Sequence, residues 1–255
     1  MPWWQRPAYD VWVRINRFLT TSYSKSIDQF VCNSINTQER IEKYYKTKAT
    51  VINPPIEIPS TKTSAVQNSS TIPKSYWLSV NRIVVHKRVE LQLEAFAKLP
   101  NERLMIVGSY EKGARQFESY KAKLDSMKPT NVEFKYWVPK DELISLYQNA
   151  KGFITTSETE DFGMTAVEAM ASGLPVIAPN EGGYKETVLD GETGILIDNI
   201  ASAKIIDAVK HISTELSLNP SLYIEKSRNR AMKYDSNRFI ETLKQLILEK
   251  HHIEL

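Results

Sequence analysis

The sequence predicts an α/β fold, a Rossmann-like parallel sheet with helices on both faces, preceded by a smaller segment. The first observation is that short apolar runs alternate with helical patterns between residues 77 and 178, which is typical of parallel sheets covered by helices. The second is that all nine glycines lie between Gly108 and Gly194. The third is a stretch rich in Ser, Thr and Pro at 59–73, which indicates a linker.

The composition excludes several classes of protein. Of the 255 residues, 42% are hydrophobic and 25% are charged, with a net charge of +3, as in an ordinary globular domain. No run approaches the roughly 20 apolar residues of a membrane-spanning helix. Cys32 is the single cysteine and cannot form an internal disulfide, and the first residues lack the order of a secretory signal. We therefore expect a cytoplasmic protein that does not bind nucleic acid.

The first fifty residues differ from the rest in charge and aromatic content. They hold eight Lys and Arg against four Asp and Glu, and they contain three of the five tryptophans. A helix that combines these features is predicted here, from Trp3, Trp4, Trp12, Arg6, Arg14 and Arg17. Such a helix either lies on an anionic membrane surface, here the inner face, or packs against another domain or a partner.

The expected elements follow in chain order. Before the linker we expect a strand within 29–34 with Ser34 as the N-cap of a helix at 37–45, and a second strand at 49–53. Beyond the linker we expect strands at 77–81, 104–107, 132–137, 152–156 and 175–178, and helices at 88–98, 114–127, 141–148 and 164–172. A last helix at 238–249 has one apolar face, which predicts packing: Phe239, Ile240, Leu243, Leu246 and Ile247.

Several common sites are disfavoured by their missing patterns. No Gly-x-Gly-x-x-Gly occurs, and the spacing from Gly108 to Gly113 continues with Ala114 and Arg115 instead of Lys followed by Ser or Thr. No Gly-x-Ser-x-Gly elbow is present either. The four histidines have no metal-ligand spacing. We expect neither a dinucleotide enzyme nor a P-loop protein, and no metal.

Functional residues are expected just after the strands, because parallel sheets bind ligands beyond the carboxyl ends of their strands. Arg82 and Lys87 follow the first strand at the start of a helix. Two cations at a helix N-terminus suit a diphosphate. After the fourth strand, Glu160 and Glu168 flank Gly163, and carboxylates accept hydrogen bonds from vicinal hydroxyls of a ribose or hexose. A third loop carries Gly182 and Gly183.

These motifs together resemble a known family. The run 77–82 with Lys87, the Glu160-x7-Glu168 pair, its continuation to Ala178, and Gly182-Gly183 with Glu186 resemble the nucleotide-sugar-binding domain of the retaining GT-B glycosyltransferases of family four (group 1). The sequence of residues 76–198 is similar to that of the mannosyltransferase branch, which builds surface polysaccharides. Residues 28–58 resemble the last strand and helix of that family's N-terminal acceptor domain, so 1–58 is expected to be a remnant of it.

The resemblance implies roles for individual residues. Arg82 and Lys87 match the pair that neutralises the donor diphosphate, and Glu160 matches the glutamate that faces the hexose, which makes these three the expected catalytic residues. The expected donor-binding residues are Asn81, Tyr136, Trp137, Val138, Phe162, Gly163, Met164, Thr165 and Glu168. Among them Glu168 matches the carboxylate that holds the ribose, residues 136–138 match the region lining the base, and 162–165 match a loop whose N–H groups meet sugar and phosphate.

Two functions of different class follow from the resemblance. The first is an enzyme that transfers a hexose, with mannose favoured, from a nucleoside diphosphate sugar such as GDP-mannose to a saccharide or lipid-linked acceptor with retention of configuration. The second is a donor-binding half that is inactive without a separate acceptor-binding chain, or that self-associates. Three departures from the family's pattern, Asn81, Tyr136 and Asp161, leave the base and the sugar open.

Overall fold

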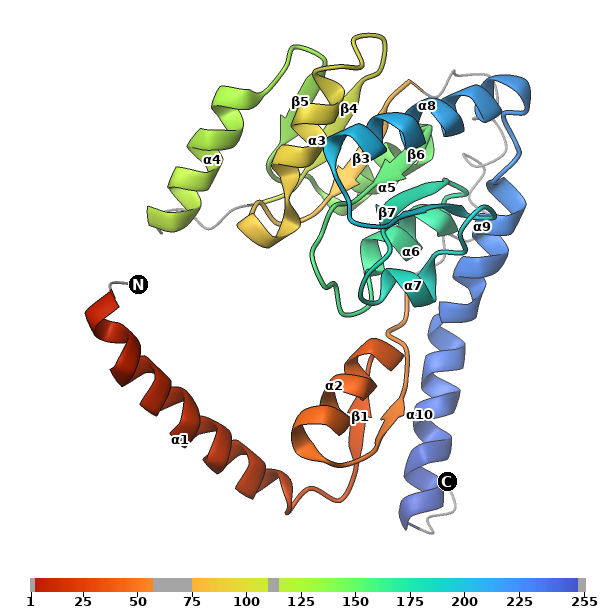
Figure 1. Cartoon of the computed structure of the whole chain (residues 1–255). Coiled ribbons are helices and arrows are strands. Elements are labelled where there is room, and N and C mark those ends of the chain that lie inside the picture. Colours follow the sequence, from red (N-terminus) through yellow and green to blue (C-terminus); the bar gives the residue numbers. More distant parts are fainter. Residues whose placement is uncertain (1–2, 57–74, 110–114, 252–255) are drawn as a thin grey trace. The chain divides into compact units, whose positions relative to one another are not determined.

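The computed structural model describes residues 3–56, 75–109 and 115–251 (Figure 1). The expected linker at 59–73 lies outside these ranges, as do Ala114 at the start of one expected helix and residues 252–255 of the terminal segment. The chain divides into two compact units, Met1–Asn53 and Pro54–Leu255. None of the described helices is long and apolar enough to cross a membrane.

The first unit contains two short strands and two helices. After a 3-10 turn (Trp3–Gln5) come α1 (Arg6–Ser24), β1 (Phe30–Cys32), α2 (Ile35–Tyr45) and β2 (Ala49–Val51). The strands pair in parallel, with Phe30 opposite Ala49. The Ser34 hydroxyl accepts a hydrogen bond from the Thr37 N–H at 3.0 Å, so the predicted N-cap is confirmed. No residue of α1 is buried.

The second unit is built on a sheet of six parallel strands (Figure 1). Its order is β5-β4-β3-β6-β7-β8, so the chain moves outward from β3 to β5 and then returns to the other side of β3. This order places a topological switch point between β3 and β6, where ligands bind in such sheets. The strands are β3 (Trp77–Val80), β4 (Leu104–Val107), β5 (Val132–Lys135), β6 (Gly152–Ile154), β7 (Val176–Pro179) and β8 (Gly194–Ile197).

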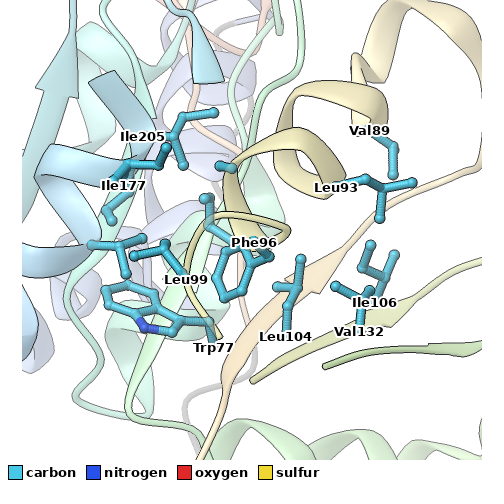
Figure 2. Packing of buried hydrophobic residues seen from close by; sticks show 14 of the residues in the cluster. Trp77, Val89, Leu93, Phe96, Leu99, Leu104, Ile106, Val132, Ile177 and Ile205 are labelled. Carbon is cyan, nitrogen blue, oxygen red and sulfur yellow. The ribbon is translucent and has the colours of Figure 1, made fainter. Parts of the chain in front are cut away.

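Helices cover both faces of this sheet. Side chains along a strand alternate between two hydrophobic clusters: Trp77 belongs to one and Leu78 to the other, as expected for strands buried on both faces. Figure 2 shows the first cluster, in which Trp77, Leu104 and Ile106 meet Leu93 and Phe96 of the covering helix. The predicted fold class is confirmed. The helices are α3 (Val89–Phe96), α4 (Arg115–Met127), α5 (Lys140–Asn149), α6 (Met164–Ala171), α7 (Tyr184–Thr187), α8 (Ser202–Leu218), α9 (Ile224–Ala231) and α10 (Ser236–His251).

The structure differs from the sequence-based expectation after residue 178. The strand β8 and the helices α8 and α9 were not among the expected elements, although Ile205, Val209 and Ile212 of α8 recur at helical spacing and are all buried. The helix α10 forms where expected. On its expected apolar face, Phe239, Leu243 and Leu246 are half-buried, while Ile240 and Ile247 are 46% and 43% exposed.

Candidate donor site at the switch point

The loops that follow β3 and β6 are tied together at the switch point. The Thr156 hydroxyl donates to the Lys87 carbonyl at 2.7 Å, and the Arg88 Nε donates to the Thr156 carbonyl at 2.7 Å. The Gln92 amide of α3 in turn donates to the Thr156 hydroxyl at 2.9 Å. Because Thr156 is buried, these bonds fix the two loops against each other.

Lys87 and Glu160 form an ion pair across this point. The Lys87 Nζ lies 2.5 Å from Glu160 Oε2, and the Ser157 hydroxyl donates to the same oxygen at 2.7 Å. The two charged side chains are only 15% and 26% exposed. Burial acts to raise the pKa of Glu160, but the hydrogen bonds from Lys87 and Ser157 outweigh it and lower that pKa. The site therefore holds an ionised carboxylate beside an ammonium group.

The glycine pair after β7 supports the backbone of Glu160. The Gly183 N–H donates to the Glu160 carbonyl at 2.7 Å. A Cβ on Gly182 would lie 2.4 Å from the same carbonyl oxygen, and one on Gly183 would lie 2.4 Å from the Asp161 carbonyl oxygen. Only glycines allow this approach. The predicted third loop thus meets the second one, through backbone contacts.

Arg88 joins the same three loops through its side chain. It has a left-handed backbone, with φ at +48°, which is uncommon for a residue other than glycine. Besides its bond to Thr156, its guanidinium pairs with the Glu181 carboxylate. The sequence placed Arg88 only at a helix start, and its unusual backbone gives no signal in the sequence.

Glu168 lies on α6 and is joined to a different helix. The Tyr147 hydroxyl of α5 donates to Glu168 Oε2 at 2.9 Å. Burial raises the pKa of Glu168, and the hydrogen bond from Tyr147 opposes that rise. Sequence reasoning missed Tyr147, because it sits within an apparently ordinary amphipathic helix.

The loop at 162–165 is held by packing as well as by backbone shape. Gly163 has φ at +87°, and a Cβ there would meet the buried Tyr184 ring at 2.6 Å. Phe162 is buried, and its ring lies edge-to-face against that of Tyr234 with the ring centroids 5.1 Å apart. Its side chain therefore belongs to the core. Met164 is exposed and Thr165 half-buried, at the N-terminal end of α6.

Two further expected residues, Asn81 and Arg82, follow β3. Arg82 is exposed, and among the described residues no bond joins it to Lys87 or Glu160. The Asn81 side chain donates to the Ser79 hydroxyl at 2.9 Å. Within the described ranges, His, Cys, Asp and Glu side chains do not gather in groups of three that could hold a metal ion.

The segment 136–138 follows β5, away from the switch point. Tyr136 stacks on Phe134 with ring centroids 6.0 Å apart, and its hydroxyl lies 3.2 Å from Asp125 of α4. Trp137 is 76% exposed, while Val138 packs against the second core cluster. Of the two aromatic residues in this segment, Trp137 is the more exposed.

Comparison with known proteins gives a consistent family. Residues 62–234 match the family model described as "Glycosyl transferases group 1". The alpha-1,3/1,6-mannosyltransferase alg-2 of Neurospora crassa is 29% identical over 230 residues, 75% of this chain and 47% of the relative. The D-inositol 3-phosphate glycosyltransferase of Corynebacterium diphtheriae is 34% identical over 140 residues, 52% of this chain and 33% of the relative.

Solved structures share the fold at lower identity. Sucrose-phosphate synthase from Thermosynechococcus elongatus has a TM-score of 0.80 at 20% identity, covering 92% of this chain and 61% of its own. Anabaena HepE in complex with UDP and glucose has a TM-score of 0.76 at 17% identity, covering 92% and 67%. The aligned part of this chain spans half or less of the curated relatives named above. Because the family model matches most of the chain, the protein belongs to the glycosyl transferases of group 1.

Proposed function

We propose that this chain carries the donor site of a retaining hexosyltransferase, which moves a hexose from a nucleoside diphosphate sugar to a saccharide or lipid-linked acceptor. The observation that carries the proposal is the Lys87–Glu160 ion pair at the switch point between β3 and β6. A cation for the diphosphate and a carboxylate for sugar hydroxyls are already in contact there. Family membership supports the same reading.

The roles that we propose for the site residues follow from the charges of their side chains. The diphosphate is the leaving group, so its negative charge grows in the transition state, and cations that meet this charge accelerate the transfer. Lys87 and Arg82 supply those cations, and Glu160 accepts from the hexose hydroxyls. Glu168 accepts from the ribose. No metal ion takes part in this proposal.

The favoured donor is GDP-mannose. The mannosyltransferase name of the Neurospora crassa relative supports mannose, whereas the HepE structure contains UDP and glucose. Calorimetric titration with GDP, UDP, ADP and their sugar conjugates tests the proposal. We expect the ligands of one base to bind clearly more tightly than the others. Absence of heat and of thermal shift with all of them at millimolar ligand would overturn it.

A second function is that of a donor-binding half that needs an acceptor-binding chain. It is favoured by the large apolar side chains that the first unit exposes, among them Trp4 of the 3-10 turn and Trp12 and Phe18 of α1, which are 63%, 59% and 73% exposed. We propose that the protein is cytoplasmic and that these exposed apolar side chains contact the acceptor-binding chain. Turnover of labelled donor onto a lipid-linked saccharide, with and without an acceptor-domain chain, separates the two functions.

A further inference from the structure

We propose that Tyr147 is a positioning residue, whose hydroxyl orients the Glu168 carboxylate toward the two ribose hydroxyls of the donor nucleotide. This inference rests on the proposed function, which assigns Glu168 to the ribose. Tyr147 itself touches no substrate in this arrangement. It acts through Glu168, from a different helix.

The contact joins two helices of the second unit. Tyr147 belongs to α5 and is 5% exposed, with its ring packed near Phe153 at a centroid distance of 6.1 Å. Its hydroxyl lies 2.9 Å from Glu168 Oε2 on α6 and, more loosely, 3.4 Å from the Thr165 carbonyl oxygen. The stronger of these two bonds therefore goes to the carboxylate.

The hydroxyl is not needed for packing. A phenylalanine ring would fill the same space, and a buried hydroxyl is costly unless it is hydrogen-bonded. In the described part of the chain, Tyr147 is the residue whose side chain donates to Glu168. The hydroxyl and the carboxylate thus satisfy each other inside a largely apolar cluster.

The remaining acceptor capacity of Glu168 fits a vicinal diol. An ionised carboxylate has two oxygens with about four acceptor sites, and Tyr147 uses one of them on Oε2. Sites remain on both oxygens for two neighbouring hydroxyls. A bond from a fixed phenol also restricts rotation of the carboxylate, so less order has to be gained when the ribose binds.

Tyr147 also helps to keep the carboxylate charged. Burial raises the pKa of Glu168, and donation from Tyr147 acts against that rise. Removing the hydroxyl should raise this pKa further, so that Glu168 is protonated at a higher pH. A protonated Glu168 has fewer acceptor sites for the ribose.

The test compares two ligands that differ only in the ribose hydroxyls. We would titrate wild type and Tyr147→Phe with whichever of GDP, UDP and ADP binds best, and with its 2′,3′-dideoxy form. We expect Tyr147→Phe to weaken the ribose form by about three- to tenfold, the effect of losing one ordinary hydrogen bond. The dideoxy form should bind equally to both proteins. As the pH is lowered, the affinity for the ribose form should begin to fall at a higher pH in Tyr147→Phe than in wild type.

Tyr76→Phe is the matched control, because the Tyr76 hydroxyl donates to the Leu146 carbonyl of the same helix at 2.8 Å. Tyr76→Phe should leave unchanged the ratio between the affinity for the ribose form and the affinity for the dideoxy form. In a Glu168→Gln background, Tyr147→Phe should not change that ratio either. Equal weakening of both ligands, or no weakening, would show that Tyr147 only packs. Failure of wild type to bind any of the nucleotides would overturn the proposed function and this inference with it.

Discussion

Lys87 and Glu160 are 73 residues apart in the chain and 2.5 Å apart in the structure. They come from loops on the two sides of the switch point, after β3 and after β6. In the structure, the lysine that is proposed to hold the diphosphate is neutralised by the glutamate that is proposed to hold the hexose. The pair keeps these two partly buried charges compensated.

Replacing Lys87 or Arg82 by alanine should weaken binding of the free nucleoside diphosphate by about 1.5 to 3 kcal/mol, the range for a hydrogen bond to a charged group. Calorimetry measures the change. The control is Lys151→Ala, because Lys151 also forms an ion pair, with Glu102, but precedes β6 at the opposite end of that strand. A comparable loss in the control would mean that charge in general, and not the switch point, governs binding.

Replacing Glu160 by alanine should separate the nucleotide from the nucleotide sugar. The variant frees Lys87 from its carboxylate partner, so the free diphosphate should bind at least as tightly as to wild type. The sugar conjugate should bind more weakly, because its hexose hydroxyls lose an acceptor. Both affinities come from the same calorimetric series. If both ligands bound equally more weakly, the assignment of Glu160 to the hexose would be wrong.

Replacing Glu168 by glutamine should stabilise the ligand-free protein at neutral pH. Burial raises the folded-state pKa of Glu168 above its usual 4.5, so the folded protein is disfavoured by ionisation of this group as the pH rises. The gain in unfolding midpoint should therefore be largest at neutral pH and fade as the pH falls toward about 4.5 and below, where the wild-type group is protonated. Thermal unfolding across this range measures it. A gain that did not depend on pH would contradict the assignment.

Replacing Gly182 by alanine should disturb the Glu160 loop. Its Cβ would lie 2.4 Å from the Glu160 carbonyl oxygen, so we expect a loss of about 1 to 3 kcal/mol from steric strain in addition to the cost of a left-handed alanine. Gly191→Ala isolates that second cost, since Gly191 also has a positive φ but nothing lies within 4 Å of its Cβ position. Unfolding by denaturant compares the two variants. Equal losses would show that contact with the Glu160 loop is unimportant.

The exposed face of α1 should make the purified protein associate. Trp12→Ser combined with Phe18→Ser removes two large apolar side chains from a helix in which no residue is buried. We expect the double variant to reduce the mass measured by light scattering or the fraction that floats with anionic vesicles. Leu218→Ser is the control, because Leu218 is 83% exposed and lies on α8. A wild-type monomer that ignores vesicles and turns over efficiently alone would overturn the partner-dependent function.

Much of the architecture is determined by the sequence alone. The alternation of apolar runs with helical patterns predicts the five strands β3 to β7, and Ser34 marks the start of α2. These features are local: they depend on side-chain period and on hydrogen bonds within a few residues. Lys87, Glu160 and Glu168 stand in a recognisable spacing, so the expectation of a site after β3 and β6 also came from the sequence.

Tertiary structure decided which of these residues meet. The order of strands brings Lys87 to Glu160, and a side-chain hydrogen bond between α5 and α6 joins Tyr147 to Glu168. Gly183 donates to the Glu160 carbonyl, a contact that its own neighbours in the chain do not predict. Pairings of this kind depend on crossover connections and on layers of helices, which the local periodicity of a sequence does not specify. The sequence therefore determined the residue types at the sheet edge, and the fold decided their partners, their burial and hence their charge states.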